Sequence, residues 1–295
     1  MSSLPSTFIQ STHPLRAHYR TQEKVRDVWL EPSPSEFSLR LPNYSNEKKK
    51  AKSQPPGFRP IVAKAIGYPT KLTHLTSRIK CIKDFVAAHP ETQFMTVVRQ
   101  VPTKYVTHML FLYARVLPVG EDKAFDKLVD EFVGGEGGDE FRRERFKYLP
   151  QLPTAPFIVK NSLRALGGHR PVLIGNGYLE CSYYSGSNYF EVDIDISSSS
   201  VAKTIANTVV GRCDKVVIDE GFVIEGRAED ELPERLLGCH RFVYCDLKGR
   251  TTMWKEGDLE SVDDTEVPKD KDKDKDKDKT ATDKGGSSGN GTGGR

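Results

Sequence analysis

The sequence lacks the features of a secreted or membrane-embedded protein. It has only five cysteines in 295 residues, and no two of them form a CxxC pair. No window approaches the roughly 18 consecutive apolar residues needed to cross a bilayer. The first residues contain no apolar run that could serve as the core of a signal peptide. We therefore expect a cytoplasmic protein with reduced thiols and no membrane anchor.

Common catalytic and metal-binding patterns are also missing. The seven histidines show no HExxH or HxxxH spacing, and Cys239, His240 and Cys245 have no fourth partner at zinc-site spacing. Buried thiols and a surface imidazole explain this group more simply. Ser200 and Lys203 match the S-x-x-K pattern of penicillin-binding enzymes, but the S-D-N and K-T-G motifs are absent, and serines here fit a helix N-cap. The sequence thus predicts no catalytic residue, no metal site and no cofactor.

The charge is unevenly distributed along the chain. Residues 256–295 carry twelve carboxylates and eight cations, a net −4, in a Lys-Asp repeat followed by a Gly-rich stretch. Because almost none of these side chains can enter a core, we expect a disordered tail. The whole chain is +3, so residues 1–255 carry +7. That surplus favours an anionic partner, such as a membrane surface, through long-range electrostatics.

Residues 28–255 are predicted to form one α+β domain after a partly ordered extension at 1–27. Two β-rich runs at 92–101 and 104–117 are separated only by a Pro-Thr turn, which predicts an antiparallel hairpin. Apolar periodicity predicts helices at 76–89, 122–133, 139–147 and 199–213, and a short helical turn at 233–237. We expect a largely antiparallel sheet packed on one face by helices, for which a START-like helix-grip fold is one arrangement.

The clearest strand pair lies at 179–196, where two β-rich runs flank a Ser-Gly-Ser-Asn turn. Alternation along the second strand directs Val192 and Ile194 toward the core. The opposite face carries an acidic ladder that we expect to face solvent. With Glu180 from the first strand, its members are Glu191, Asp193 and Asp195.

The expected pairing of this hairpin places Glu180 opposite Asp193. Like charges directly across a strand pair are destabilising, so we expect a cation to neutralise the ladder. The candidates are Arg142, Arg143, Arg145, Lys160 and Arg164. Structural ion pairs are the leading interpretation. Solvent-exposed unpaired carboxylates, and a metal or catalytic role, are the alternatives.

Two basic segments are candidate ligand- or partner-binding sites. The loop at 46–57 contributes four lysines that could contact lipid headgroups, although a plain solvated loop explains them as well. The predicted helix at 139–147 contributes three arginines but no stacking aromatics, so nucleic acid is not a predicted partner. The residues concerned are Lys48, Lys49, Lys50, Lys52, Arg142, Arg143 and Arg145.

Several blocks of the sequence together resemble the C-terminal domain of the plant enhanced disease resistance 2 family. Their order and spacing cover about residues 28–247. The blocks are VWLEPSPSEFSLRLPNY from 28, VP at 101–102, DEFRRERFKYLPQL from 139, APFIVKNSL from 155, NYFEVDIDISSSSVAKTIANTVVG from 188 and DELPERLLGCHR from 230.

The resemblance implies a domain without known catalytic residues. In the plant relatives it follows a pleckstrin-homology domain and a START lipid-binding domain, and the full-length proteins associate with membranes. We therefore expect a non-enzymatic binding domain that recognises a lipid or a peripheral membrane surface. A protein-interaction scaffold using the acidic ladder or the 139–147 helix is the second hypothesis. A hydrolase or transferase using the acidic strand is the third.

Overall fold

The computed structural model describes residues 26–164, 171–176 and 178–259. Their strands form two large sheets and one small one. The six-stranded sheet has the order β13 (Thr252–Met253), β4 (Phe58–Tyr68), β6 (Val106–Arg115), β5 (Phe94–Pro102), β10 (Tyr189–Asp195), β9 (Glu180–Ser185). The five-stranded sheet has the order β1 (Val28–Leu30), β12 (Gly238–Val243), β11 (Val217–Ile224), β7 (Phe146–Thr154), β8 (Val172–Leu173). The small sheet pairs β2 (Ser38–Arg40) with β3 (Lys50–Lys52).

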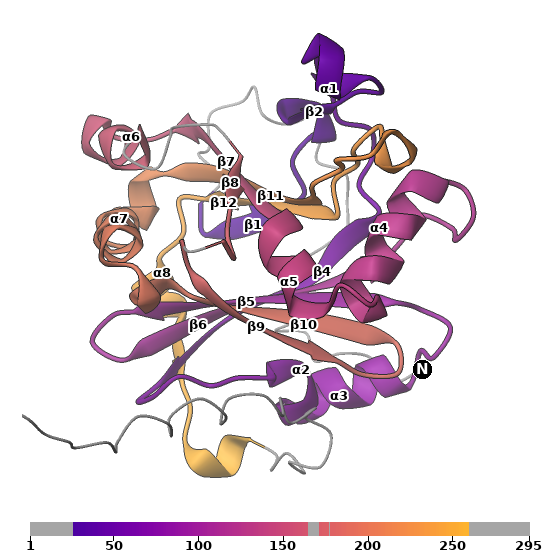
Figure 1. Cartoon of the computed structure of the whole chain (residues 1–295). Helices are drawn as coiled ribbons and strands as arrows, with labels where there is room; N and C mark the ends of the chain where they lie inside the picture. The colour runs from indigo at the N-terminus through magenta and orange to yellow at the C-terminus, as the bar shows by residue number, and fades with distance from the viewer. Residues whose placement is uncertain (1–25, 165–170, 177, 260–295) are drawn as a thin grey trace, which may run out of the picture. The chain divides into compact units, whose positions relative to one another are not determined.

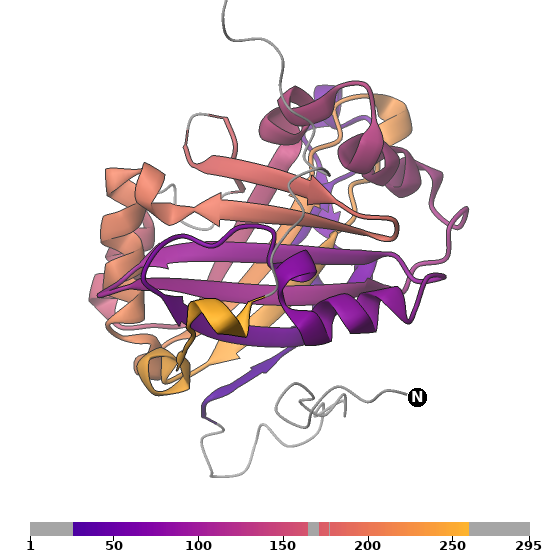
Figure 2. The ribbon, with the colours of Figure 1, turned by 90° about the horizontal axis from the view of Figure 1, so that it is seen from below.

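The helices lie around these sheets (Figure 1). A pair of helices covers the outer face of the six-stranded sheet, as the view from below also shows (Figure 2). Another pair lies at one end of the two sheets. The helices are α1 (Tyr44–Glu47), α2 (Leu75–Arg78), α3 (Lys80–Ala87), α4 (Lys123–Gly134), α5 (Gly138–Arg145), α6 (Phe157–Arg164), α7 (Ser200–Val210) and α8 (Leu247–Arg250). The covering pair is α2 and α3, and the end pair is α6 and α7.

Alternation along the central strands explains the layers. In β5, Met95 and Val97 point into the main core between the two large sheets, whereas Phe94 and Val98 point to the cluster beneath α2 and α3. Each central strand is therefore apolar on both faces, as expected of a strand buried on both sides. The α+β class with largely antiparallel sheets is confirmed. The single predicted sheet is in fact two stacked sheets.

Both predicted hairpins form, and they join side by side. β5 and β6 pair antiparallel, as do β9 and β10. β10 then pairs with β5 in parallel. The pairing within 179–196 is shifted by two residues from the predicted one, because Asp193 lies opposite Ser182 rather than Glu180. This register no longer places Asp193 opposite Glu180, but it places Asp195 directly opposite Glu180. One like-charge pair therefore remains, and Lys71, which binds Asp195, offsets it.

Three local predictions need correction. The 46–57 segment is not only a solvated loop, because β3 within it pairs with β2. The predicted helical turn at 233–237 is not helical. The Leu236 and Leu237 carbonyls accept from the Gly57 and Phe58 amides, and the Leu237 amide donates to the Phe222 carbonyl. In α7 the cap is Ser199, as the serine run suggested, but Val201 is 51% exposed, so the apolar stripe begins only at the next turn.

Candidate functional site

The acidic ladder does not face solvent, which is the main error of the sequence-based prediction. Glu191, Asp193 and Asp195 are all buried, with Glu191 only 1% exposed, whereas Glu180 is exposed. The reason is that the segment leading into α2 lies over this face of β10. The Leu75 and Thr76 amides donate to the two oxygens of Glu191 at 2.6 and 2.7 Å. The His74 amide donates to Asp193 at 3.0 Å.

Backbone amides, rather than the predicted arginines, compensate most of this negative charge. The only cation paired with the row among the described residues is Lys71, which binds Asp195. Burial opposes ionisation of Asp195, but Lys71 and Ser197 outweigh it and lower the pKa. Asp193 differs, because burial and neighbouring Glu191 raise its pKa well above the usual value. These carboxylates hold the chain together and form no open site.

The arginines of α5 are also occupied within the fold. Arg142 donates to the Phe132 and Val133 carbonyls and pairs with Asp139. Arg145 pairs with Glu231 at 2.9 Å. Arg143 is exposed. Two of these three candidate binding residues therefore have structural partners, and none of the three neutralises the acidic row as predicted.

The four candidate lysines lie exposed on the small β2–β3 sheet and its connection. Lys48 and Lys50 lie over the ring of Tyr44, at 5.5 and 5.9 Å from its centroid. Lys49 pairs with Glu47, and Lys52 is exposed on β3. Their predicted contact with headgroups stays a prediction.

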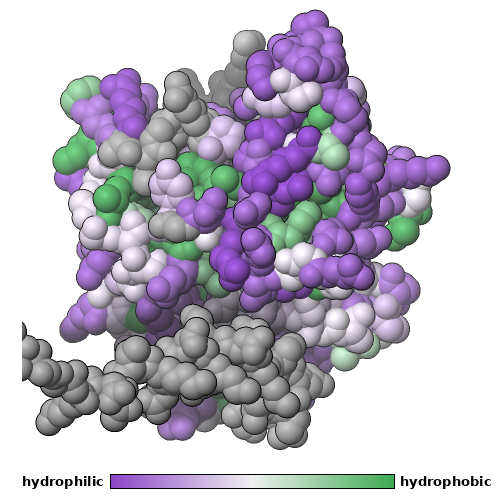
Figure 3. All heavy atoms as spheres, in the orientation of Figure 1, coloured by the Kyte–Doolittle hydropathy of each residue, from purple (hydrophilic) through white to green (hydrophobic). Residues whose placement is uncertain are grey.

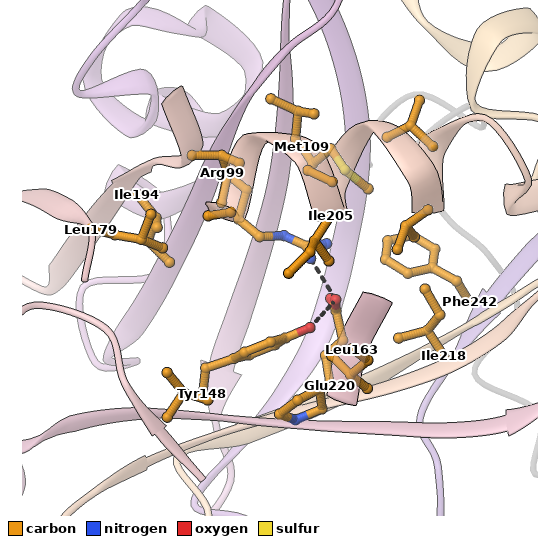
Figure 4. A pocket seen from close by; sticks show the side chains of 18 of the residues that line it. Arg99, Met109, Tyr148, Leu163, Leu179, Ile194, Ile205, Ile218, Glu220 and Phe242 are labelled. Carbon is orange, nitrogen blue, oxygen red and sulfur yellow. Dashed lines mark hydrogen bonds and ion pairs between the residues drawn. The ribbon is translucent and has the colours of Figure 1, made fainter. Parts of the chain in front are cut away.

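The structure shows a cavity that sequence patterns did not locate. It has a volume of about 180 Å³ and lies between the two large sheets at the end closed by α7 (Figure 4). Its walls are almost entirely apolar. They include Met109 and Ile194 from the six-stranded sheet, Ile218 and Phe242 from the five-stranded sheet, and Leu163 and Ile205 from α6 and α7.

One polar group interrupts the apolar wall. Arg99 on β5 reaches across the cavity and binds Glu220 on β11 at 2.5 Å. The Tyr148 hydroxyl donates to the same Glu220 oxygen at 2.6 Å (Figure 4). The other Glu220 oxygen lies 2.6 Å from His240 Nε2, and His240 Nδ1 lies 2.6 Å from the Tyr113 hydroxyl. The five residues connect the two sheets through their shared interior, and His240 is therefore buried, not a surface imidazole as predicted.

The protonation states of this group follow from burial and from each other. Burial disfavours the charged form of Glu220, but Arg99 and His240 outweigh it and bring its pKa to about 2. Burial lowers the pKa of His240, despite the opposing effect of Glu220. Burial opposes the charge of Arg99 as well, yet Glu220 leaves its pKa raised. The group therefore holds one positive and one negative charge, with His240 neutral: Nε2–H donates to Glu220 and Nδ1 accepts from Tyr113.

Arg99 is not fully satisfied by these partners. Its Nε and Nη2 atoms are buried and have no hydrogen-bond partner among the described residues. Phe111 and Phe242 lie beside the guanidinium, 5.5 and 5.8 Å from its carbon. Buried donors without acceptors are unfavourable by about 1–3 kcal/mol each. Arg99 lines the cavity, but these two atoms are enclosed by protein in the present conformation.

The sequence does contain a signal for this group. Arg99 and Glu220 each stand within an apolar β-rich run, on the side of the strand that faces the core. A charged residue at such a position requires a buried partner. Which two residues pair was decided by the stacking of the sheets.

The described residues contain neither a metal-binding cluster nor a membrane-spanning helix. They contain no cluster of three or more His, Cys, Asp or Glu side chains able to hold a metal ion. None of the described helices has the length and apolarity required to cross a bilayer.

Comparison with known proteins identifies the domain. Residues 29–246 match the family model described as the C-terminal part of protein ENHANCED DISEASE RESISTANCE 2. The chain belongs to the enhanced disease resistance 2 family. A curated relative from Arabidopsis thaliana, named ENHANCED DISEASE RESISTANCE 2-like, is 30% identical over 229 residues, which are 76% of this chain and 30% of the relative. The chain thus spans under a third of that relative's length. No solved structure matches.

Proposed function

We propose that this is a non-enzymatic lipid-binding domain that works at a membrane surface. The observation that carries the proposal is the apolar cavity with the unsatisfied donors of Arg99 at its side. Such a site, with apolar walls and few convergent polar groups, is typical of small-molecule binding.

The cavity volume limits what can enter. A volume of about 180 Å³ is close to the ~150 Å³ of an engineered cavity that holds benzene. It is below the ~300 Å³ at which drug-sized sites begin. We therefore propose that the cavity takes a ring or the end of an apolar chain, with the rest of the lipid outside.

The charge of the Arg99 group limits the polar end of the ligand. Glu220 already neutralises Arg99, so a ligand carboxylate would leave one uncompensated negative charge in a buried site. Once the Arg99 side chain turns toward the cavity, an uncharged hydroxyl, carbonyl or ester oxygen can accept from Nε or Nη2 without that penalty. The proposed ligand class is thus an amphipathic lipid with a neutral acceptor near its apolar end.

The alternatives that use the acidic ladder lose most of its residues, whereas a scaffold using the 139–147 helix stays a prediction. A hydrolase using the acidic strand would need accessible carboxylates, but those of Glu191 are buried and bonded to backbone amides. A scaffold using the acidic ladder would need it at the surface, where only Glu180 remains exposed.

Calorimetric titration of the full chain with octanol and octanoate tests the proposal. We expect octanol to bind and to raise the melting temperature, and octanoate to bind at least about tenfold more weakly at neutral pH. Comparable affinity for the two would contradict the neutral-acceptor argument. Failure of both to bind would contradict the cavity as a ligand site.

A matched pair of substitutions locates the binding. Ala206→Phe fills the cavity from α7, whereas Ala87→Phe adds the same ring to an exposed position on α3. Octanol binding should be lost in the first variant and kept in the second, and circular dichroism checks that both are folded. Preference for octanol over octanoate in the wild type is a second measure that does not depend on the variants.

A further inference from the structure

We infer that the exposed face of α6 and α7 docks on an anionic phospholipid bilayer. The inference rests on the membrane association proposed above and names the surface that provides it. It does not depend on which ligand occupies the cavity.

Helix α6 has two different faces. Val159 and Leu163 are buried and pack on the sheet end. Phe157 is 74% exposed, and Lys160 and Arg164 follow it at helical spacing on the same outer stripe. An aromatic ring that stays in water contributes no hydrophobic stabilisation to the isolated domain, so the exposure of Phe157 is better explained by contact with a partner.

Helix α7 and the turn before β9 extend this surface. On α7, Val201 is 51% exposed and Lys203 is also exposed, and Tyr178 before β9 is 60% exposed. With Phe157 and Ile158, these are four of the seven large hydrophobic side chains that the described residues expose. Figure 3 shows hydrophobic atoms on the side where Figure 1 places α6 and α7. The exposed apolar residues are therefore concentrated and not scattered.

The charge of this surface selects the partner. Neither α6 nor α7 contains Asp or Glu, and their only charged residues are Lys160, Arg164 and Lys203. None of the three forms an ion pair with a described residue, unlike Arg142 and Arg145 of α5. Apolar side chains that insert among headgroups, flanked by cations that stay with the phosphates, are characteristic of interfacial helices. The occupant is therefore a bilayer surface with anionic lipid.

The position of α7 connects this surface to the cavity. Ala202, Ile205 and Ala206 on its inner side line the cavity, while Val201 and Lys203 are exposed. Docking would thus place the helix that walls the cavity against the lipid from which a ligand would come.

Vesicle flotation of the full chain tests the inference, with phosphatidylcholine vesicles that contain or lack phosphatidylserine. We expect the wild type to float with the phosphatidylserine vesicles at low salt and to be released by high salt. Phe157→Glu with Ile158→Glu should weaken this binding by roughly tenfold or more. Val119→Glu, at an equally exposed apolar position in the β6–α4 loop, should not.

A second matched pair of variants tests whether the cations of α6 contribute to vesicle binding. Lys160→Glu with Arg164→Glu should weaken binding by roughly tenfold or more, since each cation near the surface contributes. Lys48→Glu with Lys50→Glu makes the same change on the small sheet and should have the smaller effect. Larger loss from the Lys48 and Lys50 pair, or full binding by the Phe157 variant, would overturn the inference.

The test separates the two proposals. If the wild type binds neither vesicle type, both the membrane association and this docking surface are overturned. Wild type that binds vesicles while the α6 variants bind equally would overturn this surface alone. Ala206→Phe should keep vesicle binding while losing octanol, because it changes the cavity and not the outer face.

Discussion

Two buried polar groups in this domain differ in what surrounds them. The acidic row of β10 lies against the α2 segment, which supplies backbone amides to Glu191 and Asp193. The Arg99–Glu220 pair lies beside a cavity, and two donors of Arg99 have no described partner. Both groups are removed from water, and both keep buried polar atoms without a described partner, Asp193 Oδ1 in the row and Nε and Nη2 of Arg99. Of the two groups, only the one around Arg99 lines the cavity.

This difference separates a structural role from the proposed binding role. A buried charge satisfied by its own chain stabilises local structure and offers nothing to a ligand. A buried charge that keeps free donors beside an apolar cavity can recognise one. Sequence composition pointed to the acidic row, but the unused donors point to Arg99. Stability measurements on variants of both groups test this difference.

The largest effect is expected from Glu220→Leu. It leaves the guanidinium of Arg99 buried without its counter-charge, and loss of one member of a buried pair is destabilising by about 3–5 kcal/mol. Urea denaturation at neutral pH measures the free energy of unfolding. The double variant Arg99→Met with Glu220→Leu should recover most of the loss. A single variant within about 1 kcal/mol of wild type would show that the pair is not needed to balance charge.

A smaller effect is expected from Glu191→Gln. Its two oxygens accept from the Leu75 and Thr76 amides, and a glutamine can accept only one of these hydrogen bonds. The unpaired amide should lower the free energy of unfolding by about 1–3 kcal/mol in urea denaturation. Glu180→Gln, at an exposed position on β9, is the control and should be neutral. Octanol affinity should be unchanged in both variants. A loss of octanol affinity in either would indicate that the acidic row also contributes to ligand binding.

The smallest effect, and one of opposite sign, is expected from Asp193→Asn. Because burial and Glu191 raise its pKa well above the unfolded value of 3.8, the folded state holds a proton that the unfolded state releases. The contribution of this group to stability is therefore present below about pH 4 and declines as pH rises toward the folded-state pKa. Asparagine keeps the acceptor for the His74 amide and does not titrate.

Thermal unfolding across a pH series checks this expectation. The Asn variant should match wild type near pH 4 and exceed it at neutral pH by on the order of 1 kcal/mol. A variant less stable than wild type at neutral pH would show that the carboxylate is ionised and compensated. The acidic row would then resemble the Arg99 group more closely than its geometry suggests.

Sequence patterns predicted local structure well where the signal is local. The 92–117 and 179–196 hairpins formed because a short turn fixes both partners. Helices α4 and α7 formed where apolar periodicity and a cap agree. The candidate site was less predictable. Alternation correctly separated Val192 from Asp193, but both faces of β10 are buried, so alternation could not distinguish solvent from a second layer.

The sequence alone was enough to predict the family, the two hairpins and the helices with clear apolar periodicity, because these depend on motifs and on residues close together in the chain. Tertiary structure alone decided that β5 and β11 face each other across a cavity, bringing Arg99 to Glu220 over 121 positions of sequence. It also decided that the α2 segment covers the acidic face of β10. Contacts between sheets depend on how the layers stack. Side-chain periodicity within one strand identifies its two faces but does not predict which layer covers each face.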